Sequence, residues 1–204
     1  MTQDQRRHAP ATARNREPIL SVLHRHLPSQ GLVLEIASGS GEHITFFAQS
    51  CNPGLMFQPS DPDAAARASI DAWSAALGIK NVRPAIELDA TWTDWPVSAA
   101  DAVLAINMVH ISPWAATEGL VRGAARLLPA GGVFYLYGPY RRDGRHTAPS
   151  NAAFDDDLRR RNPTWGVRDV DEVAELTKAN GFSEPIIEQM PANNLSLVFR
   201  RLAQ

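Results

Sequence analysis

The chain has little that would let it bind nucleic acid, cross a membrane or form a disulfide. Its 204 residues carry 20 basic and 22 acidic side chains, and a net charge of −2 gives no general attraction for nucleic acid. No apolar run approaches the roughly 20 residues of a membrane span. The N-terminus has no signal-peptide pattern. The single Cys51 can form neither an internal disulfide nor a thiolate metal site alone. We therefore expect a cytoplasmic protein with no metal ion and no nucleic-acid or membrane partner.

Apolar segments typical of strands alternate with amphipathic segments typical of helices. The expected strands are residues 32–37, 54–60, 82–88, 100–110, 131–140, 184–192 and 194–202. The expected helices are residues 16–27, 42–51, 64–78, 116–128 and 169–182. Such alternation predicts an α/β fold with a Rossmann-like, doubly wound, seven-stranded sheet in one domain, residues 1–204. Because no helix separates the last two strands, they form a hairpin, and one strand of the mostly parallel sheet is antiparallel.

Two stretches fall outside this alternation. Residues 1–14 are polar and are expected to form an N-terminal arm. Residues 138–168 form a long irregular stretch, and loops of this length in compact domains are usually lids or binding loops. Within it, residues 155–161 read Asp-Asp-Asp-Leu-Arg-Arg-Arg, which places each acid four residues before an arginine. This spacing favours ion pairs on a solvated helix, and binding of an anionic substrate is the alternative.

The strand at residues 32–37 runs into a turn with two glycines. Ligands of open α/β sheets bind beyond the carboxyl ends of the strands, which is where this turn lies. A dinucleotide-binding fingerprint would follow Gly39 and Gly41 with a third small residue, but Ile44 occupies that position. We expect Gly41 to allow a close approach of the backbone to a ligand. A tight turn that holds no ligand is the alternative.

Acidic residues stand on or after three successive expected strands. Asp61 could accept hydrogen bonds from both hydroxyls of a ribose, and Asp89 could accept one from an adenine amine that Trp92 covers. Glu35 lies within an apolar run, where a carboxylate is costly unless it is bonded, for example to loop amides or a ligand ammonium. The alternative for each acid is a helix cap or a turn. Three such acids around one glycine turn favour a nucleoside ligand.

This set of residues resembles the class I S-adenosylmethionine-dependent methyltransferases. Their first motif, an acid followed by a glycine-rich turn, stands here as residues 35–41, with Ala37 in place of the first glycine. Asp61 and Asp89 fall where that family holds ribose and adenine, and residues 107–112 resemble its fourth motif. Further segments resemble one uncharacterised group of methyltransferase-like proteins described as a domain of unknown function; they read APATARNREPIL, EIASGSGEH, QPSDPD, YGPY and SNAAFDDDLRRRNPTWGVRD. The resemblance implies S-adenosylmethionine as cofactor and S-adenosylhomocysteine as product, but no substrate.

The predicted site has three parts. The predicted cofactor-binding residues are Glu35, Ala37, Gly39, Gly41, Asp61, Asp89, Ala90, Asn107 and Met108, with Arg14 and Asn15 closing over the cofactor from the arm. The predicted substrate-binding residues are Asn151, Phe154, Trp165 and Arg168. His110, just past the fourth strand, is the predicted base, with a turn cap as the alternative. Tyr137 and Tyr140 border the fifth strand, one of them as core packing, and Tyr140 is the predicted catalytic member.

Two other functions remain open. A short-chain reductase needs a tyrosine followed four residues later by a lysine, but Tyr137 is followed by Arg141, and the only lysines are Lys80 and Lys178. A non-catalytic module that binds a cofactor or a partner is the other alternative. The sequence favours methyl transfer to a small molecule over an NAD(P)-dependent reductase.

Overall fold

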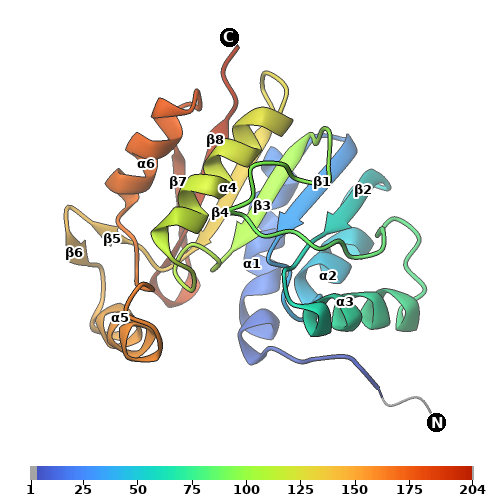
Figure 1. The fold of residues 1–204 in the computed structure, drawn as a ribbon, viewed down its shortest axis with the longest axis horizontal. Helices are drawn as coiled ribbons and strands as arrows, with labels where there is room; N and C mark the ends of the chain where they lie inside the picture. Colours follow the sequence, from blue (N-terminus) through green and yellow to red (C-terminus); the bar gives the residue numbers. More distant parts are fainter. Residues whose placement is uncertain (1–3, 204) are drawn as a thin grey trace.

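The computed structural model describes residues 4–203 and contains an open, six-stranded mixed sheet (Figure 1). Its strands, in the spatial order β2-β1-β3-β4-β8-β7, are β1 Gln30–Ile36, β2 Gly54–Pro59, β3 Ala102–Ile106, β4 Val133–Gly138, β7 Ile186–Met190 and β8 Asn194–Arg200. β1 to β4 are parallel, and β8 runs against both of its neighbours. The predicted fold class, including the single antiparallel strand, is therefore confirmed. In the described part of the chain, no helix is long and apolar enough to cross a membrane.

The strand expected at residues 82–88 does not form, so the prediction of seven strands is wrong by one. This segment runs along the outer side of β2 but makes only two isolated parallel bridges, Phe57 with Val82 and Ser60 with Ile86. Pro59 and Pro84 have no N–H group to donate. The outer segment also has one residue more between the two bridges than β2 has, so the register slips. The edge of the sheet is therefore an extended segment and not a strand.

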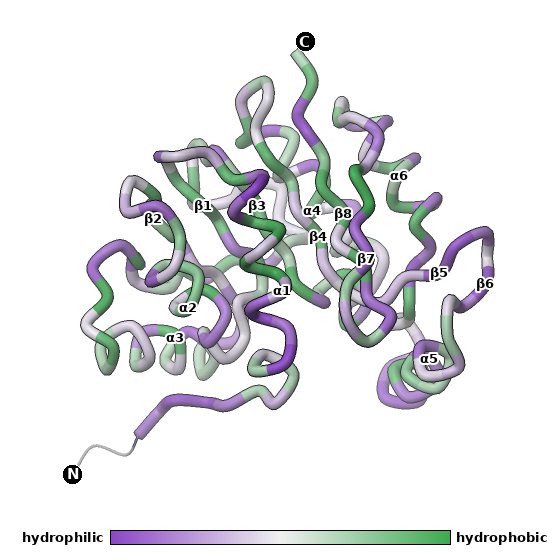
Figure 2. Tube along the Cα trace, turned by 180° about the vertical axis from the view of Figure 1, so that it is seen from behind, coloured by the Kyte–Doolittle hydropathy of each residue, from purple (hydrophilic) through white to green (hydrophobic). Residues whose placement is uncertain are grey.

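Alternate residues of the strands face two helical layers. Tyr135 and Tyr137 of β4 pack in one cluster with α1 Pro10–His26, α2 Glu42–Ser50 and α3 Ala64–Ala76. Phe134 and Leu136 pack in the other, with α4 Trp114–Leu127 and α6 Val170–Ala179. This alternation is the period of two of a strand that is buried on both faces. Figure 2, seen from behind, has α1 lying across the sheet, while Figure 1 has α4 in front of it.

The predicted N-terminal arm is also wrong over much of its length. Residues 1–3 lie outside the described part of the chain, and α1 already begins at Pro10. Only residues 4–9 are extended, and they lie against α3. The Arg7 N–H donates to Ser69 Oγ at 2.8 Å, and the indole N–H of Trp73 donates to the Arg7 carbonyl at 2.9 Å. Arg14 and Asn15 are therefore residues of a helix that packs on the sheet.

Residues 138–168 contain regular structure where the sequence predicts an irregular stretch. A short hairpin, β5 Arg141–Arg142 and β6 Arg145–His146, leads into α5 Pro149–Arg161. Asp155 is buried and holds this region together, because it accepts hydrogen bonds from the Val167 N–H at 2.7 Å and from Arg159 Nε at 3.2 Å. The expected helix of ion pairs is therefore α5, but one of its three aspartates is a buried anchor and not a solvated residue.

Candidate cofactor and substrate site

The glycine turn after β1 is built on left-handed backbone. Ala37, Gly39 and Gly41 have φ angles of +56°, +58° and +88°. The turn is tied to the end of β2, because the Ser38 N–H donates to the Ser60 carbonyl at 2.9 Å. A side chain in this region costs about 1–2 kcal/mol, so Ala37 is strained where the resembling motif has its first glycine. The chain keeps the turn's conformation although it lacks that glycine.

The two glycines of the turn serve different purposes. A Cβ atom on Gly41, the N-cap of α2, would lie 2.7 Å from Ile70 Cα in α3. Gly41 is therefore required by the packing of α2 against α3 whether or not a ligand is bound, and its predicted close approach to a ligand stays a prediction. A Cβ atom on Gly39 would meet nothing within 4 Å. Gly39 is thus the glycine that faces open space, where a ligand could approach the backbone.

Glu35 of β1 is a buried carboxyl group with a free oxygen. The side chain is 2% exposed, and its Oε2 has no hydrogen-bond partner among the described residues. Burial raises the pKa of Glu35 to about 8, with a smaller contribution from the charge of Asp61, while Ser38 acts in the opposite direction. An unsatisfied buried acceptor costs free energy, and a ligand ammonium would satisfy it. The predicted contact between Glu35 and a ligand ammonium stays a prediction.

Asp61 and Asp89 both accept hydrogen bonds within the protein, Asp61 from the glycine turn and from its own turn, and Asp89 from its own turn. Asp61 Oδ2 accepts from the Gly39 N–H at 3.0 Å, and its Oδ1 accepts from the Asp63 N–H at 2.9 Å. Asp89 Oδ1 accepts from the N–H and the hydroxyl of Thr91. Carboxylate oxygens retain further lone pairs, so both acids can still accept from a nucleoside. Their binding of ribose and adenine stays a prediction. Ala90, which follows Asp89 in the sequence, is buried.

A cavity of about 810 Å³ lies beyond the carboxyl ends of β3 and β4. It brings together five of the predicted residues: Arg14 and Asn15 from α1, Asn107 after β3, and Asn151 and Phe154 from α5. The turn between β7 and β8, residues 191–194, closes one side. Cavities of this size hold small molecules. Residues predicted for the cofactor and residues predicted for the substrate therefore line the same cavity. Met108, which follows Asn107 in the sequence, is buried.

Tyr137 lines this cavity, whereas Tyr140 does not. It is the penultimate residue of β4, and it faces the α1 side of the sheet. Burial raises the pKa of the Tyr137 hydroxyl, while hydrogen bonding with Asn15 and Asn194 offsets part of that effect. Asn15 Oδ1 also lies 2.8 Å from His43 Nε2. Burial lowers the pKa of His43 to about 4, so the ring is neutral at pH 7 and its N–H donates to Asn15. A linked polar network thus borders the cavity.

The two predicted catalytic residues are buried together and do not line the cavity. His110 and Tyr140 have no exposed surface, and their rings meet edge to face at 4.6 Å. The Arg168 N–H donates to His110 Nδ1 at 3.2 Å, and burial with the Arg168 charge lowers the pKa of His110 to about 3. Both residues occupy packing positions that give a substrate no access. Their catalytic roles stay predictions that this geometry does not support.

Two predicted substrate residues also lie outside the cavity lining. Arg168 donates through Nε to the Val109 carbonyl at 3.0 Å and through its terminal nitrogen to the Ser112 carbonyl at 2.7 Å. It therefore ties the segment after α5 to the segment after β3. Trp165 lies under the guanidinium of Arg161, whose central carbon is 5.3 Å from the ring centroid. Neither Arg168 nor Trp165 lines the cavity.

The comparison with protein families decides where this chain belongs. A family model described as "Protein of unknown function (DUF938)" matches residues 6–201, nearly the whole chain. The chain belongs to the DUF938 family. The predicted resemblance to an uncharacterised group is thereby confirmed, and the motif at residues 35–41 lies inside the matched region.

Solved structures share the fold of this DUF938 protein. A putative O-methyltransferase from Nostoc punctiforme PCC 73102 is 22% identical with a TM-score of 0.81, covering 94% of this chain and 57% of that one. An O-methyltransferase family protein from Burkholderia thailandensis is 18% identical with a TM-score of 0.80, covering 95% and 58%. Human N-acetylserotonin methyltransferase in complex with SAM is 14% identical with a TM-score of 0.75, covering 95% and 53%. The DUF938 chain thus has the class I methyltransferase fold and spans little more than half of these chains.

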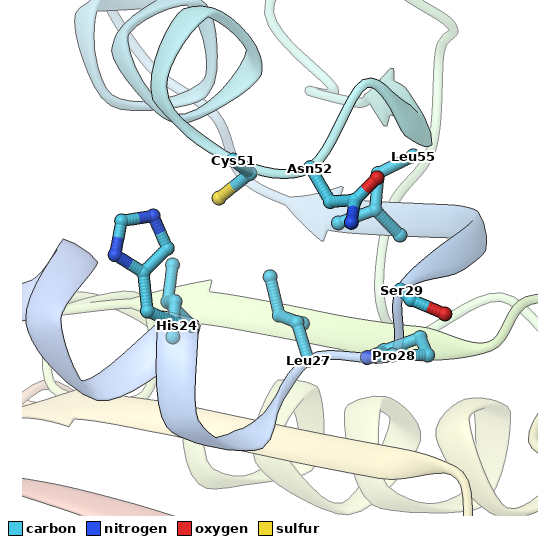
Figure 3. A pocket seen from close by; sticks show the side chains of 8 residues that line it. His24, Leu27, Pro28, Ser29, Cys51, Asn52 and Leu55 are labelled. Atoms are coloured by element: carbon cyan, nitrogen blue, oxygen red, sulfur yellow. The ribbon is translucent and has the colours of Figure 1, made fainter.

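A second cavity of the DUF938 protein, of about 200 Å³, lies at the amino ends of β1 and β2, and Figure 3 shows its lining side chains. Its wall joins the end of α1 with the segments that lead into β1 and β2, and it includes His24 and Cys51. Burial raises the pKa of the Cys51 thiol to about 11, so the reactive thiolate is scarce at pH 7. Within residues 4–203, no group of three or more potential ligands could hold a metal ion.

Proposed function

We propose that this DUF938 protein transfers a methyl group from S-adenosylmethionine to a small molecule. The observation that carries the proposal is the unpartnered, buried Oε2 of Glu35 at the start of the left-handed turn. It leaves an acceptor without a donor where the class I fold presents its cofactor. Two structural neighbours are described as methyltransferases with bound SAM or SAH, and a third is described as "PigF with SAH", which supports the same ligand here.

Residues on the β1 and β2 side are assigned to the cofactor. Glu35 would accept from its ammonium group, the backbone at Gly39 would pack against it, and Asp61 would accept from its ribose. Asp89 would accept from its adenine, beside Trp92, which is 42% exposed and free to cover a ring. When bound, S-adenosylmethionine supplies an electrophilic methyl group. The protein's own work is to orient the two reactants and to keep water out.

Residues on the β3 and β4 side are assigned to the methyl acceptor. Asn107, directly after β3, and Tyr137 of β4 both line the cavity there. Tyr137 has a raised pKa and remains protonated at pH 7, so its hydroxyl can position an acceptor by hydrogen bonding. A base is needed only when the acceptor carries a proton that must leave. We therefore propose catalysis by alignment, with no part for His110.

A thermal-shift panel tests the proposal. S-adenosylhomocysteine should raise the melting temperature by several degrees, because a ligand at 100 times its dissociation constant stabilises by about 2.7 kcal/mol. NAD and NADP should leave it unchanged, since Ile44 is fully buried where a dinucleotide fold has a small residue. Stabilisation by NADP without stabilisation by S-adenosylhomocysteine would contradict the methyltransferase proposal and favour a reductase.

A further inference from the structure

The larger cavity has an uneven balance of charge. Its ionisable lining side chains are Arg14, Arg161 and Tyr137, and no aspartate or glutamate lines it. Tyr137 remains neutral at pH 7 because burial raises its pKa. The chain as a whole carries a net charge of −2. The cavity is therefore a positively charged region on a slightly acidic protein. Any attraction that it has for an anion comes from its own arginines and not from the net charge of the chain.

Arg14 and Arg161 make few hydrogen bonds or ion pairs with other residues of the protein. Arg14 makes no hydrogen bond or ion pair within residues 4–203, and its side chain is exposed on the first half of α1. Arg161 reaches one acid, Asp157, at a distance of 3.9 Å, and otherwise only stacks over Trp165. Arg159, by contrast, is bound to the buried Asp155. Arg14 and Arg161 therefore keep free donors, and two guanidinium groups that line one cavity suit a carboxylate or a phosphate.

Apolar side chains line the same cavity as these arginines. Phe154 and Ile111 line the cavity, and they are two of the six large apolar side chains that the described residues leave exposed. Pro139 adds a further apolar wall. An exposed aromatic ring next to free cations is a common design for binding a flat molecule with a charged end. The remaining lining side chains are mostly asparagines, which can bond a polar substituent.

We propose that the methyl acceptor is a small aromatic or similarly flat apolar molecule that carries one anionic group. Phe154 and Ile111 pack against its body, and Arg14 and Arg161 bind its anion. This inference rests on the proposed function, because it takes the larger cavity to be the acceptor site. It narrows the acceptors to aromatic or apolar acids and excludes cationic amines.

Two fluorescent probes with one shared body test the charge requirement. 8-Anilinonaphthalene-1-sulfonate is anionic, and N-phenyl-1-naphthylamine is its neutral counterpart. The wild-type protein should bind the sulfonate more tightly. Arg161→Gln and Arg14→Gln should each weaken the sulfonate about 5-fold or more and the neutral probe less than about 2-fold, since each removes a charged donor. Phe154→Ala should weaken both probes, because it removes apolar wall.

Arg160→Gln is the matched control. Arg160 precedes Arg161 on α5, is more exposed, pairs with the same Asp157, and does not line the larger cavity. It should leave both affinities unchanged. Benzoate and phenyl phosphate, added as competitors with benzyl alcohol as the neutral reference, identify whether the anion is a carboxylate or a phosphate. Displacement of the sulfonate by either acid, and not by the alcohol, is the expected result.

The proposal is overturned if Arg14→Gln and Arg161→Gln leave sulfonate binding intact, if Arg160→Gln has the same effect, or if benzyl alcohol competes equally well. Binding of S-adenosylhomocysteine is measured separately on each variant. If the parent does not bind it, the proposed function fails, whatever the probes report. If the parent binds it but probe binding ignores charge, only the acceptor class fails. If Arg14→Gln weakens S-adenosylhomocysteine alone, Arg14 binds the cofactor and the two-arginine site is contradicted.

Discussion

The two halves of the site are built in different ways. On the β1 and β2 side, the site is mostly backbone: a turn with three left-handed residues, whose Gly39 N–H is fixed by Asp61. On the β3 and β4 side, the site is mostly side chains from α1, α5 and the turn after β7, which are distant in sequence. A conformation set by neighbouring residues leaves a short motif in the sequence. A cavity assembled by tertiary packing leaves none, which explains why the cofactor is easier to infer than the acceptor.

The largest effect that tests this comparison is expected from Gly41→Ala. The new methyl group would be 2.7 Å from the α3 backbone at a φ of +88°. Because strain and overpacking add, we expect a loss of about 2–4 kcal/mol in the free energy of unfolding without any ligand. Urea denaturation measures it. Gly78→Ala is the control, since its φ is +63° but no atom lies within 4 Å, so strain alone should cost about 1 kcal/mol. Equal losses in both variants would refute the contact with α3.

Glu35→Gln should change how stability depends on pH. The folded-state pKa of Glu35, about 8, lies above its ordinary 4.5, so the unfolded chain ionises first. The wild-type protein should therefore lose stability as the pH rises from 4.5 to 8, and the variant should lack that loss. We expect the difference between the two to grow by about 1 kcal/mol or more between pH 5 and pH 8.5. Parallel pH profiles from urea denaturation would show that Glu35 is bonded and ionised in the free protein.

Gly39→Ala should separate binding from stability. Its Cβ atom would meet no protein atom, so its cost in free energy of unfolding should match that of Gly78→Ala, about 1 kcal/mol. Its affinity for S-adenosylhomocysteine should fall about 10-fold or more, because the methyl group occupies the space for the ligand. Calorimetry on both variants measures this. An unchanged affinity in Gly39→Ala would mean that the open space is not the cofactor's.

The smallest effect is expected from Ala37→Gly. Removing the side chain relieves left-handed strain of about 1–2 kcal/mol, while the more flexible unfolded chain takes back about 0.5–1 kcal/mol. The variant should be as stable as the parent or slightly more stable in thermal denaturation. A clear destabilisation would show that the methyl group of Ala37 contributes packing that outweighs its strain.

The sequence predicts the fold well because its signals are local. Apolar runs place the six strands, and the missing helix after residue 182 predicts the antiparallel strand β8. The strand at residues 82–88 fails because Pro84 and Pro59 remove donors on both sides of the expected ladder. The order in residues 138–168 depends on the buried Asp155, whose partner Val167 is twelve residues away. Periodicity cannot reveal such a contact.

The sequence predicts the site less evenly. The period of two within β4 already puts Tyr137 on the α1 face, but Tyr140 lies beyond Gly138, where the strand has ended and the alternation no longer applies. His110 is polar and follows a strand, which made it a candidate base. Its burial against Tyr140 comes from packing between segments that are thirty residues apart. A residue's type and place in the sequence therefore did not reveal its access to a ligand.

The most direct test of the central claim is isothermal calorimetry of S-adenosylhomocysteine with the wild-type protein and with Glu35→Gln. Glu184→Gln, a change to an exposed glutamate far along the chain, is the control. We expect binding to the parent and to the control, and affinity about 10-fold weaker in Glu35→Gln, since the carboxyl group that would ionise and accept from the ligand ammonium is lost. No binding to the parent, or equal binding to all three proteins, would contradict the claim that the buried Oε2 of Glu35 binds the cofactor.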